Sequence, residues 1–305
     1  MKKIGFLLIT LLPYTCILAQ NSIDLFTVAG HYSVPTKYDG GRTERGREHI
    51  WNMNLKVPLV LSKTNTFYSE ISYYNFSVNG DLEAPSTMAH PLDLHGIIMQ
   101  TGLIHRLDED HALVMLFVPR LMGDLISIES NSFQWGGIGL FEKRFHKSLL
   151  MRFGASYNQE LFGPFVVPLV YMNWQLSDKW LIVGLLPVYA KINRFINNKL
   201  SVGFHYFGLV TTYRLGQENH ENDYIERRSI DLSLFARRSI FRNVHFEVRA
   251  GFALGRDYAQ YDENDKLDFA LPLVNFGDNR QQENISFNGG PFIRGQLVYN
   301  LPINR

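Results

Sequence analysis

The residues best able to do acid–base or metal chemistry in this chain are its ten histidines, which are scattered singly along 305 residues. None of them forms a close pair at the spacing of zinc ligands. The chain also lacks a P-loop, a His-Glu-x-x-His motif and a Gly-x-Ser-x-Gly motif. We therefore expect no catalytic residue, no metal site and no cofactor.

A hydrolase built into a β-barrel wall would need a serine close to a histidine. Ser201 and His205 share the polar face of the strand predicted over 199–215. Four residues along a strand separate them by about 13 Å, too far for a hydrogen bond. We favour a hydrogen bond between His205 and an interior neighbour, and keep a barrel-embedded lipid hydrolase as an alternative function.

The remaining chemistry-bearing residues are charged side chains on the polar faces of alternating segments. Lipid opposes a charge near the bilayer midplane by about 2–4 kcal/mol, so these side chains must point into an interior. Both signs occur on neighbouring strands, which favours cross-strand ion pairs. The alternative is that the arginine excess biases a pore toward anions. These inward-facing candidates are Arg106, Arg120, Arg152, Glu160, Asp231, Arg237, Glu247, Arg249 and Arg294.

The segments that position these charges have a period of two. From Leu149 to Tyr157 every second residue is apolar and the residues between them are mostly polar, and Val244 to Leu254 repeats the pattern. Such alternation is typical of a β-strand with one polar face. No apolar run after Gln20 approaches the roughly 20 residues that a membrane helix requires.

The connections between these strands are of two kinds. Six are short and polar, whereas 37–47, 79–91, 216–223 and 257–284 are longer. Short turns on one rim and long loops on the other are typical of bacterial outer-membrane barrels, and this spacing predicts about 14 strands. Pro187 favours a break between two strands, although prolines inside other strands keep about 12 strands as an alternative. The predicted strands are 25–36, 48–62, 66–79, 93–107, 111–123, 131–145, 149–161, 164–176, 179–186, 188–196, 199–215, 224–238, 243–257 and 286–300.

The composition agrees with a transmembrane barrel. Aromatic residues reach 13%, mean hydropathy is only -0.11, and the net charge of +1 gives no electrostatic footprint for nucleic acid. A soluble sandwich or lipocalin-like barrel also alternates, but soluble up-and-down barrels have about eight strands. Aromatic residues toward the strand ends would form girdles at the headgroups. They are Trp51, Tyr171, Trp174, Trp180, Tyr206, Phe246 and Tyr299.

The N-terminus predicts export. Lys2 and Lys3 precede an apolar run and the segment ends at Ala19, which is typical of a cleavable signal peptide over 1–19. Cleavage removes Cys16, the single cysteine, so the single barrel domain over 20–305 has no disulfide. We expect a monomer in the outer membrane of a Gram-negative bacterium.

Several turn and strand phrases of this sequence carry a family resemblance. They are Asp178-Lys179-Trp180-Leu181, Asn197-Asn198-Lys199-Leu200, His146-Lys147-Ser148-Leu149, Leu186-Pro187-Val188-Tyr189-Ala190 and Thr212-Tyr213-Arg214-Leu215. Together they resemble an outer-membrane β-barrel family of unknown function from Bacteroidetes-like bacteria. The resemblance implies location and fold, and brings no catalytic residues with it. It also implies two partners, the outer-membrane lipid and the barrel-assembly machinery, for which Tyr299 would serve as an internal recognition residue.

The sequence therefore predicts a passive, porin-like channel or a structural barrel with a blocked lumen. A surface adhesin carried on the outer loops is a further alternative. Because a wall of about 14 strands is too wide for its own side chains to fill, we expect 257–284 to fold into the mouth. Pairing as a short extension of the wall and capping the mouth are the alternatives for this loop. Its acidic residues would then meet Arg120, Arg152, Arg249 or Arg294. A turn centred on Ile240 would place Asp231 opposite Arg249.

Overall fold

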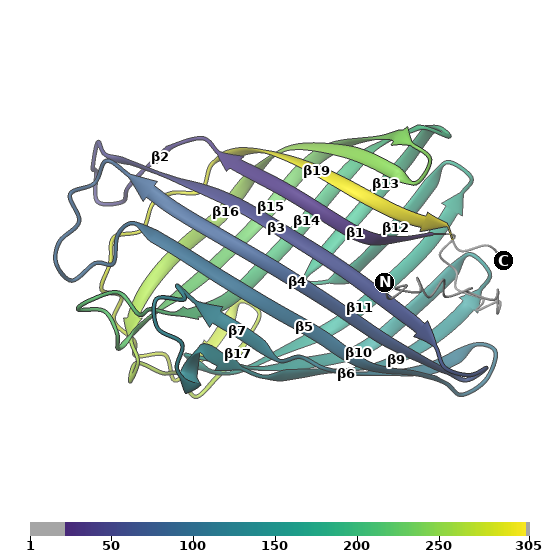
Figure 1. Ribbon diagram of the computed structural model, residues 1–305, viewed down its shortest axis with the longest axis horizontal. Coiled ribbons are helices and arrows are strands. Elements are labelled where there is room, and N and C mark those ends of the chain that lie inside the picture. Colours follow the sequence, from purple (N-terminus) through teal and green to yellow (C-terminus); the bar gives the residue numbers. More distant parts are fainter. Residues whose placement is uncertain (1–21, 303–305) are drawn as a thin grey trace, which may run out of the picture.

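The computed structural model describes residues 22–302, so the predicted signal peptide over 1–19 lies outside the described residues. The chain forms a closed antiparallel β-barrel with 14 wall strands that run obliquely to its long axis (Figure 1). β1 pairs with β3 on one side and with β19 on the other, which closes the wall. The predicted fold is confirmed, and the count of 14 replaces the alternative of 12.

The wall strands lie close to the predicted spans. Twelve are single strands: β1 (Ser22–Ser33), β3 (Arg45–Val60), β4 (Asn65–Gly80), β5 (Leu92–Arg106), β10 (Leu149–Glu160), β11 (Gly163–Ser177), β12 (Trp180–Leu186), β13 (Tyr189–Asn197), β14 (Leu200–Arg214), β15 (Asp223–Phe241), β16 (Val244–Asp262) and β19 (Pro291–Pro302). Two more are interrupted: β6 (His111–Phe117) continues as β7 (Arg120–Gly123), and β8 (Phe133–Gln134) continues as β9 (Gly136–His146). The remaining pieces are β2 (Thr36–Lys37), η1 (Ser130–Ser132), β17 (Phe269–Leu271) and β18 (Val274–Phe276).

The two rims differ as predicted. The short turns 61–64, 107–110, 147–148, 178–179, 198–199 and 242–243 share one rim, which we call the turn end. The loops 34–44, 81–91, 124–132, 215–222 and 263–290 share the other rim, the loop end, together with two tight connections at 161–162 and 187–188. Among residues 22–302 no helix is long and apolar enough to cross a bilayer.

Side chains alternate between the two faces of the wall. On β10, Phe153 is exposed on the outside, whereas Ser156 and Glu160 are buried on the inside. Of the predicted girdle residues, Trp51, Trp180, Phe246 and Tyr299 are exposed on the outer face. Tyr171 is a correction, because it lies opposite inward-facing Arg152, which stacks over its ring at 4.8 Å.

The interior of the loop end is apolar. Two clusters of buried side chains lie there, one around Phe76, Leu94 and Tyr213, the other around Phe165, Val167 and Leu267. We call them the apolar cap. Opposite walls therefore do meet, contrary to the expectation that a wall this wide could not be filled by its own side chains.

One stretch of the wall does not reach the loop end. β12 and β13 form a short hairpin, so the pairing of β11 with β12 ends at Val170 and that of β13 with β14 ends at Phe207. The loop-end halves of β11 and β14 thus have no barrel-wall neighbour on that side. β17 occupies part of this gap by pairing Ala270 with Phe165 of β11.

Candidate pore and its loop-end closure

Charged side chains of the inner face meet partners on strands that are not neighbours in the wall. Glu48 on β3 lies 3.0 Å from Arg227 on β15, and Lys191 on β13 lies 2.5 Å from Glu247 on β16. Two wall strands or more separate the members of each pair. These ion pairs therefore cross the interior of the barrel.

Glu247 is the centre of a buried cluster of cations. Its carboxylate accepts hydrogen bonds from Lys191 Nζ at 2.5 Å, Arg249 Nε at 2.8 Å and Gln296 Nε2 at 3.0 Å, and Arg237 Nη1 lies at 4.0 Å. We call Glu247 with Lys191, Arg237 and Arg249 the Glu247 cluster. Three cations therefore share one fully buried carboxylate. Arg237 has further compensation from Asp24, whose two oxygens it contacts at 2.7 and 2.9 Å.

Arg294 adds a further positive charge to this layer. Its guanidinium donates to Asn52 Oδ1 at 2.7 Å and to Gln296 Oε1 at 3.4 Å, both of them neutral. No carboxylate between residues 22 and 302 lies within ion-pair distance of it. Around Glu247 the four cations Lys191, Arg237, Arg249 and Arg294 therefore outnumber the three carboxylates Glu247, Asp24 and Asp231.

A second buried cluster surrounds Glu48 nearer the loop end. Besides Arg227, Glu48 has Arg256 at 3.8 Å and His31 at 3.5 Å, and Tyr258 donates its hydroxyl to the same carboxylate. The Arg227 guanidinium also stacks over the ring of Phe76 at 4.3 Å, at the edge of the apolar cap. Charge and apolar packing thus hold this level together.

A polar seam joins β14 to β7 and β10 where β14 lacks a wall partner. Arg120 Nη1 donates to Glu160 Oε1 at 2.8 Å, and Glu160 Oε2 accepts from the Thr212 backbone N at 3.0 Å and its Oγ1 at 2.7 Å. All three side chains are buried. The Glu160 carboxylate replaces the backbone acceptor that a neighbouring strand would supply.

Two other predicted inward residues have partners on their own or a neighbouring strand. Arg152 pairs with Glu142 of the neighbouring β9 at 2.7 Å, which is a cross-strand ion pair. Asp231 accepts from Ser229 Oγ at 2.5 Å and lies opposite Ala253, not Arg249. The hairpin turns at 242–243 with a bulge between Ser239 and Phe241, so the partner of Asp231 is shifted from Arg249 to Ala253. The predicted pairing was therefore wrong, although each residue keeps its predicted face.

Ser201 and His205 both lie on the inner face of β14, opposite Arg237 and Ser233 of β15. His205 Nε2 lies 2.9 Å from Arg249 Nη1, so the interior neighbour is an arginine. A serine–histidine hydrogen bond of 3.0 Å does join Ser148 and His146 at the turn end. Within 22–302 no carboxylate is hydrogen-bonded to that histidine, and no group of side chains is suited to hold a metal ion.

The chain crosses the interior at the loop end. Beyond Pro119, β7 stays paired with its wall neighbours β5 and β8, and Gly123 at its end also pairs in parallel with Arg214 of β14. A Cβ atom at Gly123 would lie 2.9 Å from the Arg214 carbonyl oxygen, so this close approach requires glycine. Loop 124–132 then continues across, with Glu129 accepting from Arg214 Nη2 at 2.8 Å and Asp124 accepting from the Gly216 backbone N at 2.7 Å.

Loop 81–91 closes the opposite part of the mouth. Leu82, Met88 and Ala89 are buried in the apolar cap. The Ala89 backbone N donates to Gln260 Oε1 at 2.8 Å, and Gln260 Nε2 donates to the Thr87 carbonyl at 3.0 Å. Loops 81–91 and 124–132 therefore form the closure, which the sequence did not indicate.

Loop 257–284 is not the plug that we predicted. β16 extends to Asp262, and of the apolar block only Leu267 and Ala270 are buried, whereas Leu273 is 94% exposed. Its acidic residues bond within the loop or to nearby polar groups, for example Asp257 to Ser286 Oγ and Asp262 to Asn264. None of them contacts the predicted arginines.

An arginine, not a carboxylate, anchors that loop. Arg280 donates to Glu226 at 2.7 Å and to Asp278 at 2.9 Å, and stacks over Tyr261 at 4.3 Å. The hydrogen bonds from Arg280 hold the pKa of the Asp278 carboxyl well below its usual range. We call 263–283 the strap, since it lies along the gap beside β11.

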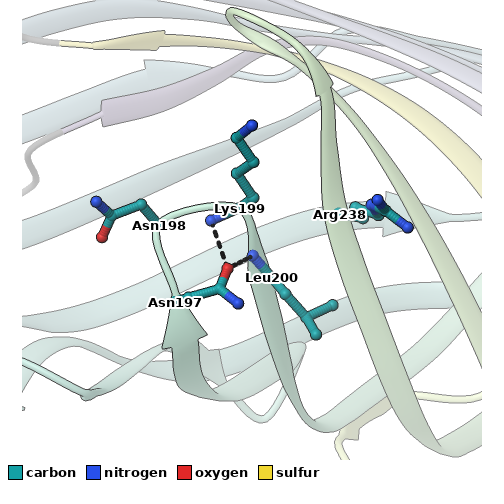
Figure 2. A pocket seen from close by; sticks show the side chains of 5 residues that line it. All are labelled: Asn197, Asn198, Lys199, Leu200 and Arg238. Atoms are coloured by element: carbon teal, nitrogen blue, oxygen red, sulfur yellow. Dashed lines mark hydrogen bonds between the residues drawn. The ribbon is translucent and has the colours of Figure 1, made fainter.

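A hollow of about 630 Å³ lies at the turn end, and Figure 2 shows the five side chains that line it, Asn197, Asn198, Lys199, Leu200 and Arg238. The Asn197 Oδ1 atom accepts from the backbone N of Lys199 at 2.9 Å and of Leu200 at 3.0 Å, which is a local turn bond. The side-chain oxygen of Asn197 is therefore already occupied by the turn. The side chains of Lys199 and Arg238 make the lining of this hollow positive.

Residues 15–270 match the family described as "Domain of unknown function (DUF6268)". The chain belongs to this family of unknown function. No curated protein matches it.

Solved structures similar to this DUF6268 member are outer-membrane barrels. An outer membrane channel from Pseudomonas putida F1 has 8% identity and a TM-score of 0.45, with 90% of this chain and 95% of the other covered. The TodX monoaromatic hydrocarbon channel, as a deltaS2 mutant, has 10% identity, a TM-score of 0.37 and coverages of 91% and 88%. The NanC porin has 10% identity, a TM-score of 0.36 and coverages of 90% and 98%.

Several residues of the clusters around Glu247 and Glu48 were not among the residues predicted from the sequence. Lys191 carried a usable signal, because Lys191 and Asn193 alternate with Ile192 in the predicted strand 188–196. Arg256 carried only an indirect signal, Gly255, which has a positive φ and lies in a bulge between Leu254 and Asp257 that reverses which residues of β16 face inward.

Proposed function

We propose that this protein is a passive outer-membrane channel for small solutes that prefers anions, and that loops 81–91 and 124–132 close its loop end. The excess of cations around Glu247 carries this proposal. Lys191, Arg237 and Arg249 share Glu247, and Arg237 also pairs with Asp24. Among residues 22–302 Arg294 hydrogen-bonds only to neutral side chains, with Asp231 as a further carboxylate in its surroundings. A positive interior lowers the energy of an anion that passes through it.

The location rests on the outer face of the barrel. Exposed apolar side chains cover the wall strands, for example Leu55, Ile97, Phe153, Leu234 and Leu297. A band of this kind matches the hydrocarbon core of a membrane. Export through the signal peptide over 1–19 and a monomeric state belong to the same proposal.

Single-channel recording in a planar bilayer tests the function. The matched variant replaces 124–132 with a Gly/Ser linker of equal length, which removes the Asp124 and Glu129 contacts. We expect higher conductance in this variant and, under a KCl gradient, a reversal potential of the sign for chloride. A reversal potential of the sign for potassium would contradict the proposed anion preference.

A structural barrel is the second candidate, and the apolar cap favours it. Gly123 and Arg214 touch across the interior, and Phe76, Leu94 and Tyr213 are fully buried beside them. If neither the wild type nor the linker variant conducts, the structural role is the better explanation.

A further inference from the structure

On the outer face near the loop end, five neighbouring strands place one row of residues side by side. Gly30 of β1 lies opposite Gly295 of β19 and opposite Trp51 of β3. Trp51 in turn lies opposite Asn75 of β4, and Asn75 lies opposite His95 of β5. Two glycines are thus followed by an indole, an amide and an imidazole.

The next row toward the loops is more polar. Tyr32 lies opposite Ile293 and opposite His49, His49 lies opposite Ser77, and Ser77 lies opposite Asp93. The Tyr32 and His49 rings meet edge to face at 4.8 Å. An aromatic half and a hydrogen-bonding half therefore adjoin on one surface.

The two glycines open a hollow beside Trp51. A Cβ atom at Gly30 would meet nothing within 4 Å, and one at Gly295 would meet only the Phe246 ring, at 3.7 Å. Neither residue has a positive φ. Neither the backbone conformation nor a close approach requires glycine here. The absence of two side chains instead leaves room in a hollow of about 540 Å³, which is walled by the exposed rings of Trp51 and Tyr32.

Asp93 provides the polar edge of this surface. It accepts from Asn75 Nδ2 at 2.6 Å and from Ser77 Oγ at 3.0 Å, and His95 Nε2 lies at 3.5 Å. Its side chain is still 65% exposed, so acceptor capacity remains. His95 Nδ1 is held at 2.8 Å from the hydroxyl of Tyr73, which fixes the ring.

The row on the other side, away from the loops, is almost entirely apolar. It consists of Leu297, Val28, Met53, Tyr73 and Ile97, which are in register across the same five strands. The hollow therefore sits where the apolar band of the wall ends. A molecule lying there would meet rings and polar groups with one part and hydrocarbon with the other.

We propose that this surface, which we call the Trp51 hollow, binds the saccharide headgroup of a membrane glycolipid. A sugar ring has an apolar C–H face that packs on an indole and hydroxyl groups that donate to a carboxylate and bond with amides. The Asp93 carboxylate disfavours a phosphate at the same place. The acyl chains then lie against the apolar row that runs from Leu297 to Ile97.

This inference rests on the proposed membrane location but not on conduction, because the hollow lies outside the barrel. The test is native mass spectrometry of the full-length mature protein released from micelles doped with a glucosyl diacylglycerol. The same protein is titrated with the parent diacylglycerol and with free glucose. Gly30→Leu fills the hollow, and Trp51→Ala removes its wall. Gly139→Leu is the matched control, since Gly139 of β9 also faces outward with nothing within 4 Å of its Cβ position.

We expect the wild type and Gly139→Leu to bind the glycolipid at least tenfold more tightly than Gly30→Leu and Trp51→Ala do. The diacylglycerol should show no such difference between variants. Equal binding of the glycolipid by Gly30→Leu and wild type, or equal binding of glycolipid and diacylglycerol by the wild type, would overturn the proposal. Tight binding of free glucose would instead assign the hollow to a soluble saccharide and reject the glycolipid. Heat-dependent mobility on gels verifies that each variant folds, and unchanged conductance in Gly30→Leu separates this outcome from a failure of the channel proposal.

Discussion

Removing the charge of Glu247 should destabilise the barrel more than any comparable change at the surface. Glu247→Gln keeps the size of the side chain and an acceptor oxygen, but leaves Lys191 and Arg249 without their carboxylate. Both cations are only 12% exposed, so water cannot replace that partner.

The contacts set the magnitude. At 2.5 and 2.8 Å and an effective dielectric constant near 20, each attraction is on the order of 6 kcal/mol before desolvation. The cost of burying the carboxylate cancels much of this gain, and removing one partner of a buried pair typically costs about 3–5 kcal/mol. We expect a loss in that range for Glu247→Gln.

Urea-driven unfolding in detergent micelles, followed by tryptophan fluorescence, measures this loss. Glu109→Gln in the exposed 107–110 turn is the control, with an expected change within about 0.5 kcal/mol. Adding Lys191→Met to Glu247→Gln should recover part of the stability, because one uncompensated cation disappears. The reasoning fails if Glu247→Gln unfolds like the control, or if the double variant is less stable than the single one.

Three further outcomes follow from the closure and the strap. Thr212→Val removes the β14 hydroxyl that donates to Glu160 and should lower the free energy of unfolding by about 1–3 kcal/mol in the same assay, whereas Thr212→Ser should not. Replacing 263–283 with a Gly/Ser linker should leave conductance unchanged, in contrast to replacing 124–132, and bilayer recording compares the two. Because hydrogen bonds lower the pKa of Asp278, its contribution to the strap is present above the usual aspartate pKa and is lost as pH falls through the lowered value. Hydrogen exchange of the strap amides, corrected for intrinsic rates, should therefore increase in acid, and Asp278→Asn should abolish that dependence.

The strands could be predicted because the alternation is local. Phe153 and Ser156 fall on the faces that their neighbours in sequence indicate, and the short polar turns mark one rim. The register between β15 and β16 could not be predicted in the same way. It depends on two bulges, one opposite Ser229 that is marked only by Gly255 and one at Ile240 that no glycine or proline marks.

The partners of the inner charges were also beyond the sequence. Arg120, Glu160, Glu247 and Arg249 could be assigned to the inner face, since lipid excludes charge. Which of them meet depends on how the wall bends. Arg120 reaches Glu160 where opposite sides of the wall meet, because Gly123 at the end of β7 pairs with Arg214 of β14.

The sequence does contain a signal for the apolar cap, but the argument from barrel width led to the opposite expectation. Phe165 to Val170 is apolar on both faces, which is typical of a strand buried on both sides rather than one facing water within a pore. A round wall of 14 strands would be too wide for Phe165 and Val167 to find partners across it. The wall is not round at this level, because Gly123 of β7 pairs with Arg214 on the half of β14 that β13 does not reach, and this pairing joins opposite sides. An apolar run on both faces of a barrel strand therefore predicts the level at which the barrel is closed, and here it predicts the loop end.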